Sequence, residues 1–138
     1  MKIFESIVEL QDYLDLQRSK GKSIGLVPTM GALHAGHIQL IEESVGRSDV
    51  TVCSIFVNPT QFNNPEDLLK YPKQLDEDKQ MLLDAGCDVL FVPFVQEMYP
   101  DNNKSLTFNF GFLETVLEGA FRPGHFSGVG IVVSKLLN

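Results

Sequence analysis

Apolar and polar residues follow one another along the chain in blocks typical of helices and strands. Between Ser6 and Gly21, apolar residues recur every three or four positions, which predicts a first helix that ends at the glycine. Ser6 and Glu9 have the spacing of a capping box, in which each side chain accepts a backbone N–H of the other residue. We therefore expect this helix to begin at Ser6.

Two apolar blocks rich in β-branched residues predict strands. Residues 23–27 form a short apolar run that stops at Pro28, which predicts a buried strand. Residues 49–57 are apolar almost without interruption. This pattern is typical of an interior strand of a parallel sheet that is covered on both faces.

The next blocks continue the alternation of helix and strand. Apolar residues share one helical face over residues 38–45, and again over residues 75–85 before Gly86, which predicts two helices. Residues 88–92 form a third apolar run and predict a strand that closes at Pro93.

Patterns in the rest of the chain are weaker. They favour a helical turn at Asn64-Pro65, a strand over residues 106–110 and helices over residues 113–120 and 128–137. Strands alternating with helices predict an α/β fold, with a parallel sheet, right-handed crossovers and helices on both faces.

Length and composition agree with one globular domain. The chain has 138 residues, of which 43% are hydrophobic and 21% charged, which excludes disorder, collagen and coiled coil. Eleven Lys and Arg residues against 18 Asp and Glu residues give a net charge of −7, so general nucleic-acid binding is not expected. A small phosphorylated ligand stays compatible with this charge, because a helix terminus can attract phosphate locally.

Three features predict a cytoplasmic protein with no membrane contact. Residues 1–14 carry acidic side chains and lack the apolar core of a signal peptide. The longest charge-free apolar stretch, residues 50–62, is too short to span a membrane. Cys53 and Cys87 lie inside apolar runs, which predicts buried, reduced thiols.

Two loops are the candidate ligand sites, because parallel sheets bind ligands beyond the carboxyl ends of their strands. They are residues 28–37 and residues 58–64. The two glycines of the first loop permit a close approach of ligand to main chain, and the start of the following helix suits phosphate. His34 and His37 are three residues apart, so both imidazoles can face one ligand and donate to its oxygens.

Two further roles for this histidine pair remain open at the level of the residues. A zinc pair would need additional ligands, and the HExxH spacing is absent. Histidines that cap a helix or pack in a core would also account for the pattern. Nucleotide binding is the favoured hypothesis among the three.

Three strings, in this order, resemble a known enzyme family. HAGH at residues 34–37 looks like the HxGH signature of nucleotidyltransferases, which activate substrates at the α-phosphate of ATP. The longer string PTMGALHAGH at residues 28–37, VNPTQF at residues 57–62 and LEGAFRPGHF at residues 117–126 resemble the pantoate–β-alanine ligase (pantothenate synthetase) family. The resemblance covers essentially the whole chain.

This resemblance implies a fold and a reaction. Residues 1–138 are expected to form the Rossmann-like N-terminal domain that binds nucleotide and pantoate, with the smaller C-terminal domain of the family absent. The implied reaction condenses pantoate with β-alanine through a pantoyl-adenylate intermediate and releases pyrophosphate and AMP, a step of pantothenate and coenzyme A biosynthesis. ATP is then a substrate, Mg²⁺ is expected with it, and a homodimer is expected.

Roles for individual residues are implied in the same way. The stretch that faces ATP comprises Met30, Gly31, Ala32, Leu33, His34, Ala35, Gly36 and His37. His37 is the expected catalytic, proton-donating group, and His34 is an expected phosphate contact. Gln61 is expected to hold pantoate and then β-alanine, because an amide both donates and accepts, and Asn58 is placed with it. Simple turn chemistry around Pro59 is the alternative for these two amides.

Two further groups are expected to be structural. Arg122 and Glu118 predict an ion pair that shapes their loop, and direct phosphate binding by Arg122 or His125 is the alternative. The acidic run at residues 76–78 predicts a solvated helix face, help in holding Mg²⁺ is the alternative, and no protein ligand for a metal is assigned.

Two other functions are kept beside the ligase. The chain is alternatively a non-catalytic nucleotide-binding and dimerisation module, because the second half of the family's sequence is missing. A nucleotidyltransferase that acts on another acceptor is the third hypothesis, and the VNPTQF string disfavours it.

Overall fold

The computed structural model describes residues 1–61, 66, 71, 72, 74–100, 109–112, 116, 121 and 124–137. The chain divides into two compact units. Unit 1 comprises Met1–Phe56 and Pro72–Glu97, and unit 2 comprises Val57–Tyr71 and Met98–Asn138. Each unit has its own candidate site and is described by itself.

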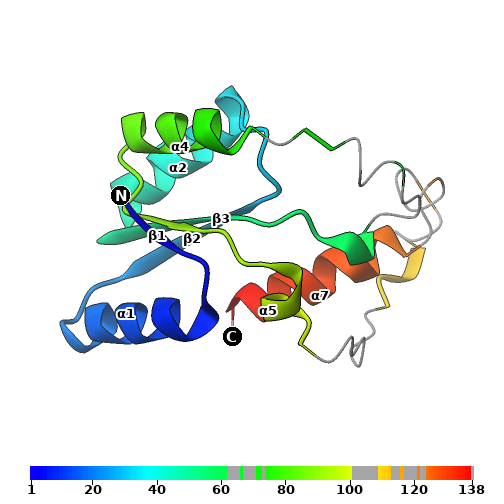
Figure 1. Cartoon of the computed structure of the whole chain (residues 1–138), viewed down its shortest axis with the longest axis horizontal. Coiled ribbons are helices and arrows are strands. Elements are labelled where there is room, and N and C mark those ends of the chain that lie inside the picture. Colours follow the sequence, from blue (N-terminus) through cyan, green and yellow to red (C-terminus); the bar gives the residue numbers. More distant parts are fainter. Residues whose placement is uncertain are drawn as a thin grey trace. The chain divides into compact units, whose positions relative to one another are not determined.

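Unit 1 is built on a four-stranded parallel sheet (Figure 1). Its strands are β1 (Lys2–Phe4), β2 (Ile24–Thr29), β3 (Val50–Ile55) and β4 (Val89–Phe91). They lie in the order β1-β4-β3-β2, and every neighbouring pair is parallel. The carboxyl ends of all four strands therefore meet at one edge, which confirms the predicted parallel sheet.

Helices cover both faces of this sheet, as predicted. Figure 1 shows α1 (Ile7–Ser19) on one face, and α2 (Ala35–Arg47) and α4 (Leu75–Asp84) together on the other. Gly21 and Gly86 follow α1 and α4 with φ of +75° and +80°, left-handed values that end a helix at little cost for glycine. Both glycines were predicted as helix ends.

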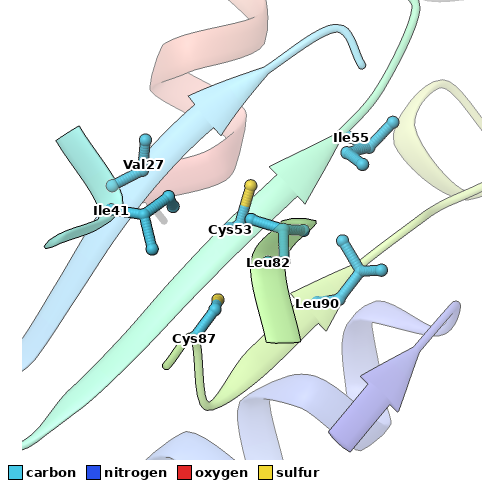
Figure 2. Packing of buried hydrophobic residues seen from close by; sticks show 7 residues of the cluster. All are labelled: Val27, Ile41, Cys53, Ile55, Leu82, Cys87 and Leu90. Atoms are coloured by element: carbon cyan, nitrogen blue, oxygen red, sulfur yellow. The ribbon is translucent and has the colours of Figure 1, made fainter. Parts of the chain in front are cut away.

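The core lies between the sheet and the pair α2 and α4. Its buried side chains, shown in Figure 2, are Val27, Ile41, Cys53, Ile55, Leu82, Cys87 and Leu90. Every residue of β3 is buried, as expected of an interior strand covered on both faces. Both cysteines are free thiols in this core, and burial raises the pKa of the Cys53 thiol to about 12, which keeps it protonated.

Unit 2 contains the 3₁₀ turn η1 (Pro59–Gln61) and the helix α7 (His125–Leu137), which pack against one another. Gly128, Ile131 and Val132 are the buried residues of α7. The short helix α5 (Val95–Met98) spans the boundary between the units. In the part of the chain described, no helix is long and apolar enough to cross a membrane.

Two predictions about the N-terminal residues were wrong. The chain starts with β1 rather than with a helix, because three residues at the sheet edge are too few to show a period. The capping box at Ser6 is not formed: Ser6 precedes α1 without a side-chain cap bond, and the Ile7 N–H donates to Glu97 Oε1 at 2.7 Å instead. Glu97 thus bonds the first N–H of α1, whereas the predicted box would have bonded the N–H groups of Ser6 and Glu9.

The strand predicted to stop at Pro28 continues through it to Thr29. The sheet order leaves β2 at an edge, where a residue without an N–H is tolerated. At the other end of the chain, α7 begins at His125, three residues before the predicted start.

Other predicted elements fall wholly or mostly outside the described residues. These are the helical turn at Asn64-Pro65, the strand over residues 106–110 and the helix over residues 113–120. Of the predicted strand, residues 109 and 110 are described, and they are not in a strand.

Candidate functional site

The loop between β2 and α2 begins with a hydroxyl that holds its first turn. Thr29, the last residue of β2, donates from Oγ1 to the Ser54 carbonyl at 2.8 Å and accepts the Gly31 N–H at 3.2 Å. Gly31 and Ala32 then adopt left-handed backbone angles, with φ of +81° and +50°. This pair reverses the chain at the carboxyl end of the sheet, where ligands bind in such folds.

A buried carboxylate from α4 fixes the rest of the loop. Asp78 Oδ2 accepts the Ala32 N–H at 3.0 Å, and Oδ1 accepts the Leu33 N–H at 2.7 Å. Asp78 is 2% exposed. Charge-assisted bonds of this kind are among the stronger ones in proteins, so the carboxylate defines the path of the loop.

The expectation of a solvated acidic face over residues 76–78 was wrong for Asp78. Asp76 is 100% exposed in its side chain and Glu77 is also exposed, as expected, but Asp78 points into the protein. A signal was present in the sequence, because Asp78 lies on the same helical face as Leu75, Leu82 and Ala85. A lone carboxylate on an apolar face indicates a buried partner.

His34 and His37 form a paired cap at the start of α2. His34 is the N-cap residue, and its Nδ1 accepts the Gly36 N–H at 3.2 Å. His37 Nδ1 accepts the His34 N–H at 3.4 Å, and the two ring centroids are 4.1 Å apart. The helix-capping role that the sequence left open is thus performed by the Nδ1 atoms of both rings. Because each Nδ1 accepts, each neutral ring carries its proton on Nε2, which is then a donor for a ligand.

A glycine is required in the HAGH string for a steric reason. A Cβ placed on Gly36 would lie 3.1 Å from His34 Cε1 and 3.3 Å from His34 Nδ1. Both distances are tighter than ordinary van der Waals contact, so a side chain there would displace the ring. The His-x-Gly-His spacing therefore describes one compact unit in which the first ring packs over the glycine.

Opposing effects set the charge of His37. Burial lowers its pKa, and the neighbouring His34 lowers it further, while the carboxylate of Asp78 raises it. The net effect lowers the pKa of His37 below its ordinary value of 6.5. At neutral pH the His37 ring is therefore mainly neutral.

The candidate residues of unit 2 surround a buried amide. Asn58 is 0% exposed, and its Nδ2 donates to the Gly128 carbonyl of α7 at 3.0 Å. Its Oδ1 accepts the Thr60 N–H at 3.2 Å, the Thr60 hydroxyl at 2.9 Å and the Tyr99 hydroxyl at 2.9 Å. Asn58 thus uses both ends of its amide to hold η1 against α7, which is more than a simple turn around Pro59 requires.

The remaining predicted site residues lie at or beside the ends of elements. Gln61 is the last residue of η1, Met30 follows β2, Ala35 opens α2 and His125 opens α7. The His125 and Phe126 rings meet edge to face, with centroids 5.6 Å apart. Arg122 and Glu118 lie outside the described residues. Among the residues that are described, no group of three or more His, Cys, Asp or Glu side chains could hold a metal ion.

Comparison with known proteins identifies the family. The family model for pantoate-beta-alanine ligase matches residues 2–138. A pantothenate synthetase of Bacteroides thetaiotaomicron is 54% identical over 138 residues, which is 100% of this chain and 49% of the relative. One of Cytophaga hutchinsonii is 53% identical over 133 residues, or 96% of this chain and 47% of the relative.

Solved structures agree with this match. The pantoate-beta-alanine ligase of Francisella tularensis, complexed with beta-gamma ATP and beta-alanine, has a TM-score of 0.87 and 47% identity and covers 99% of this chain and 52% of its own. The pantothenate synthetase of Thermus thermophilus has a TM-score of 0.86 and 41% identity, over 99% and 48% of the two chains. The chain therefore spans about half the length of these relatives. By sequence and by fold, it belongs to the pantoate-beta-alanine ligase family.

Proposed function

We propose that the chain supplies the nucleotide loop and part of the acceptor site for the ATP-dependent condensation of pantoate with β-alanine. The observation that carries this proposal is the pair of imidazoles at the start of α2. Each ring accepts a backbone N–H on Nδ1 and so keeps Nε2–H as a donor beside the helix N-terminus. That arrangement suits phosphate oxygens. The Francisella ligase, a relative of this fold, was solved with beta-gamma ATP and beta-alanine, which supports the same ligands here.

The first step joins two anions, and this is its main difficulty. An oxygen of the pantoate carboxylate attacks the α-phosphorus of ATP, the bond to the bridging oxygen breaks, and pyrophosphate leaves with the electron pair. Catalysis of such a step depends on positioning the reactants and on stabilising the charge that develops on the leaving group. In our proposal residues 30–37 perform both tasks through the Nε2–H donors of the two imidazoles and the positive end of the α2 dipole, because the N–H groups of the loop already bond within the protein.

His34 and His37 have related roles in this step. The lowered pKa of His37 makes its ring neutral at pH 7, so it donates a hydrogen bond from Nε2 rather than carrying a full positive charge. Bound phosphates would raise this pKa again, because a nearby negative charge favours the protonated ring. The hydrogen bond that His37 donates from Nε2 therefore becomes stronger as negative charge grows on the leaving pyrophosphate. His34 contacts a phosphate group in the same proposal.

The second step forms the amide. The amine of β-alanine attacks the acyl carbon of pantoyl adenylate, the bond to the AMP oxygen breaks, and the amine loses a proton. We assign Gln61 to hold pantoate and then β-alanine, because its amide can donate to a carboxylate and accept from a hydroxyl or amine. Asn58 is buried and bonded within unit 2, so we propose that it positions η1, on which Gln61 stands.

Magnesium belongs with the substrate in this proposal. Mg²⁺ in nucleotide enzymes is held largely by phosphate oxygens and water. Both oxygens of Asp78, the buried carboxylate nearest the loop, already accept backbone N–H groups. We therefore assign no protein ligand to the ion, whose chemistry when bound is to neutralise the charge of the triphosphate.

Substitution of His37 tests the proposed reaction. The purified chain is mixed with pantoate, β-alanine and Mg-ATP, and pyrophosphate release, labelled pantothenate and nucleotide affinity are measured. Loss of a hydrogen-bond donor to developing charge is expected to slow pyrophosphate release by about 100-fold or more in His37→Ala. Gln39→Ala, an exposed position on the same helix, is the matched control and should behave as the wild type. Wild-type rates in His37→Ala would contradict the assignment.

A second function is favoured by one specific observation. The chain spans about half the length of its relatives, while the bonds that hold residues 31–37 lie within unit 1. A nucleotide-binding module without turnover is therefore the alternative. Nucleotide affinity without pyrophosphate release by the wild-type chain would favour that module, whereas labelled pantothenate would favour the ligase.

The expected assembly and location are also proposals. We propose a homodimer, which light scattering on the purified chain checks directly. We propose a cytoplasmic location, which is supported by two buried thiols that stay reduced in the core.

A further inference from the structure

We propose that Asp78 is a positioning residue of the nucleotide loop: its buried carboxylate holds the backbone of Ala32 and Leu33 so that His34 and His37 meet at the start of α2. This inference rests on the proposed function, because it gives Asp78 a part in nucleotide binding by residues 30–37. Asp78 contacts neither imidazole through a described hydrogen bond, so it acts through the backbone and through its charge.

The residues held by Asp78 lie directly before the two histidines along the chain. Leu33, whose N–H donates to Asp78 Oδ1 at 2.7 Å, is followed directly by His34, the N-cap of α2. The path of the backbone at Leu33 therefore sets the position from which the His34 side chain extends. His37 is linked to the same point, since its Nδ1 accepts the His34 N–H.

Gly31 lies close to the carboxylate of Asp78. A Cβ on Gly31 would lie 3.0 Å from Asp78 Oδ2 and 3.0 Å from Ile55 Cγ2. The loop therefore approaches the carboxylate so closely that glycine, which also accepts the φ of +81°, is the residue that fits. The shape of the loop at Gly31 therefore fits the position of the Asp78 carboxylate.

A carboxylate matches the two donors that the loop presents. Burial of a carboxylate is unfavourable unless its oxygens are hydrogen-bonded, and here each oxygen accepts a different backbone N–H. An amide in the same place would offer one acceptor and one donor, so one of the two N–H groups would face an N–H group. The loop needs two acceptors, and only a carboxylate of this size supplies them.

The charge of Asp78 also acts on His37. Among the described residues, the charged groups that act on His37 are His34, on the same helix end, and Asp78, from α4. Asp78 raises the pKa of His37 against the opposing effects of burial and of His34. The same carboxylate thus places the loop and keeps His37 easier to protonate when phosphates arrive.

Substitution by the isosteric amide tests the proposal. Asp78→Asn keeps the size of the side chain and removes one acceptor and the charge. Because the loop would spend less time in its binding conformation, the apparent Kd for Mg-ATP, measured by calorimetry, is expected to rise about tenfold. The pKa of His37, followed by NMR, is expected to fall, which a merely structural role would not produce.

Asp76→Asn is the matched control. It makes the same change of charge in the same turn of α4, on a side chain that is 100% exposed. It should leave both the Kd for Mg-ATP and the pKa of His37 at their wild-type values. The proposal is overturned if folded Asp78→Asn binds Mg-ATP with the wild-type Kd and shows an unchanged pKa for His37.

A measurement on the wild-type chain keeps the test open should Asp78→Asn fail to fold. In hydrogen exchange, the amide protons of Ala32 and Leu33 should be protected, because both N–H groups donate to a buried carboxylate. Exchange of both amides at the rate of an unfolded chain would overturn the clamp. A wild-type chain that protects both amides but binds no Mg-ATP would contradict the proposed function instead, so the two failures are distinguishable.

Discussion

In both the loop after β2 and the turn after β3, one buried polar side chain makes at least two of the hydrogen bonds that hold the segment, but that side chain comes from different places. In the loop, the Asp78 carboxylate reaches in from α4 and accepts N–H groups 45 and 46 residues away in sequence. In the turn, the amide of Asn58 belongs to the segment that it holds. The first device is remote and charged, whereas the second is local and neutral.

The difference follows from what each segment presents to a side chain. The loop offers two N–H groups, which need two acceptors, and a carboxylate has acceptors only. The turn offers N–H and O–H donors on one side and the Gly128 carbonyl on the other, which need an acceptor and a donor together. The partners of Asp78 thus require a carboxylate, and the partners of Asn58 require an amide. Exchange of either group for the other would leave a partner without its hydrogen bond.

Among the substitutions that test this comparison, Asn58→Asp is expected to lower the stability most. The change keeps the acceptor for Thr60 and Tyr99 but loses the donor to the Gly128 carbonyl and puts a buried charge beside that oxygen. Unfolding in urea at neutral pH should show a loss of about 3 kcal/mol in stability. The loss should shrink at low pH, where the protonated acid regains a donor.

Asn109→Asp is the control for that experiment. Asn109 lies in the same unit, but it is exposed and its Oδ1 accepts the Gly111 N–H at 2.8 Å without needing a donor in return. A change of less than about 0.5 kcal/mol is expected there. If the two variants lose equal stability, the amide of Asn58 does not hold the turn in the way described.

Gly31→Ala tests how closely the loop fits Asp78. The new Cβ would meet Asp78 Oδ2 and Ile55 Cγ2 at 3.0 Å, at a residue whose φ is +81°. Strain and displacement together should lower the free energy of unfolding by about 2 kcal/mol. Gly46→Ala, in α2 and with nothing within 4 Å of the added Cβ, should instead raise it by about 0.5 kcal/mol. Equal effects in both variants would show that the loop has room that the structure does not indicate.

The smallest expected effect is the pH dependence that His37 gives to stability. Its pKa in the folded chain lies below the ordinary 6.5, so the unfolded chain binds the proton more readily. The contribution of His37 is therefore fully present above pH 6.5 and is lost as the pH falls from 6.5 toward the folded-state pKa. His37→Gln should lose less stability than the wild type between about pH 7.5 and about pH 5.5 in urea titrations. A larger loss in the variant would show that the pKa of His37 is raised on folding.

Much of the fold could be predicted because it depends on local patterns. The interior strand β3, the helices α1, α2 and α4 and the glycines after α1 and α4 all follow from runs and periods within a few residues. The elements that were missed depend on distant partners. Three residues make the strand β1 only because β4 pairs with them, and the Ile7 N–H at the start of α1 donates to the distant carboxylate of Glu97.

The candidate site divides in the same way. The HAGH and VNPTQF strings locate the loop and the turn, and Asn58 stands inside its string. Asp78 was assigned to solvent because the acidic run around it outweighed the apolar face on which it lies. Sequence spacing can place a residue on a helical face, but the two N–H groups that make burial of this carboxylate favourable are visible only in the folded chain.

An amide-resolved NMR titration of the chain with Mg-ATP tests the central claim most directly, namely that residues 30–37 form a nucleotide site held ready by Asp78. We predict shifts that concentrate at Gly31, His34, Gly36 and His37, while the amides of Ala32 and Leu33 keep the low-field positions of N–H groups bonded to a carboxylate. A folded spectrum that does not change with Mg-ATP, or shifts that occur elsewhere and leave this loop untouched, would contradict the claim.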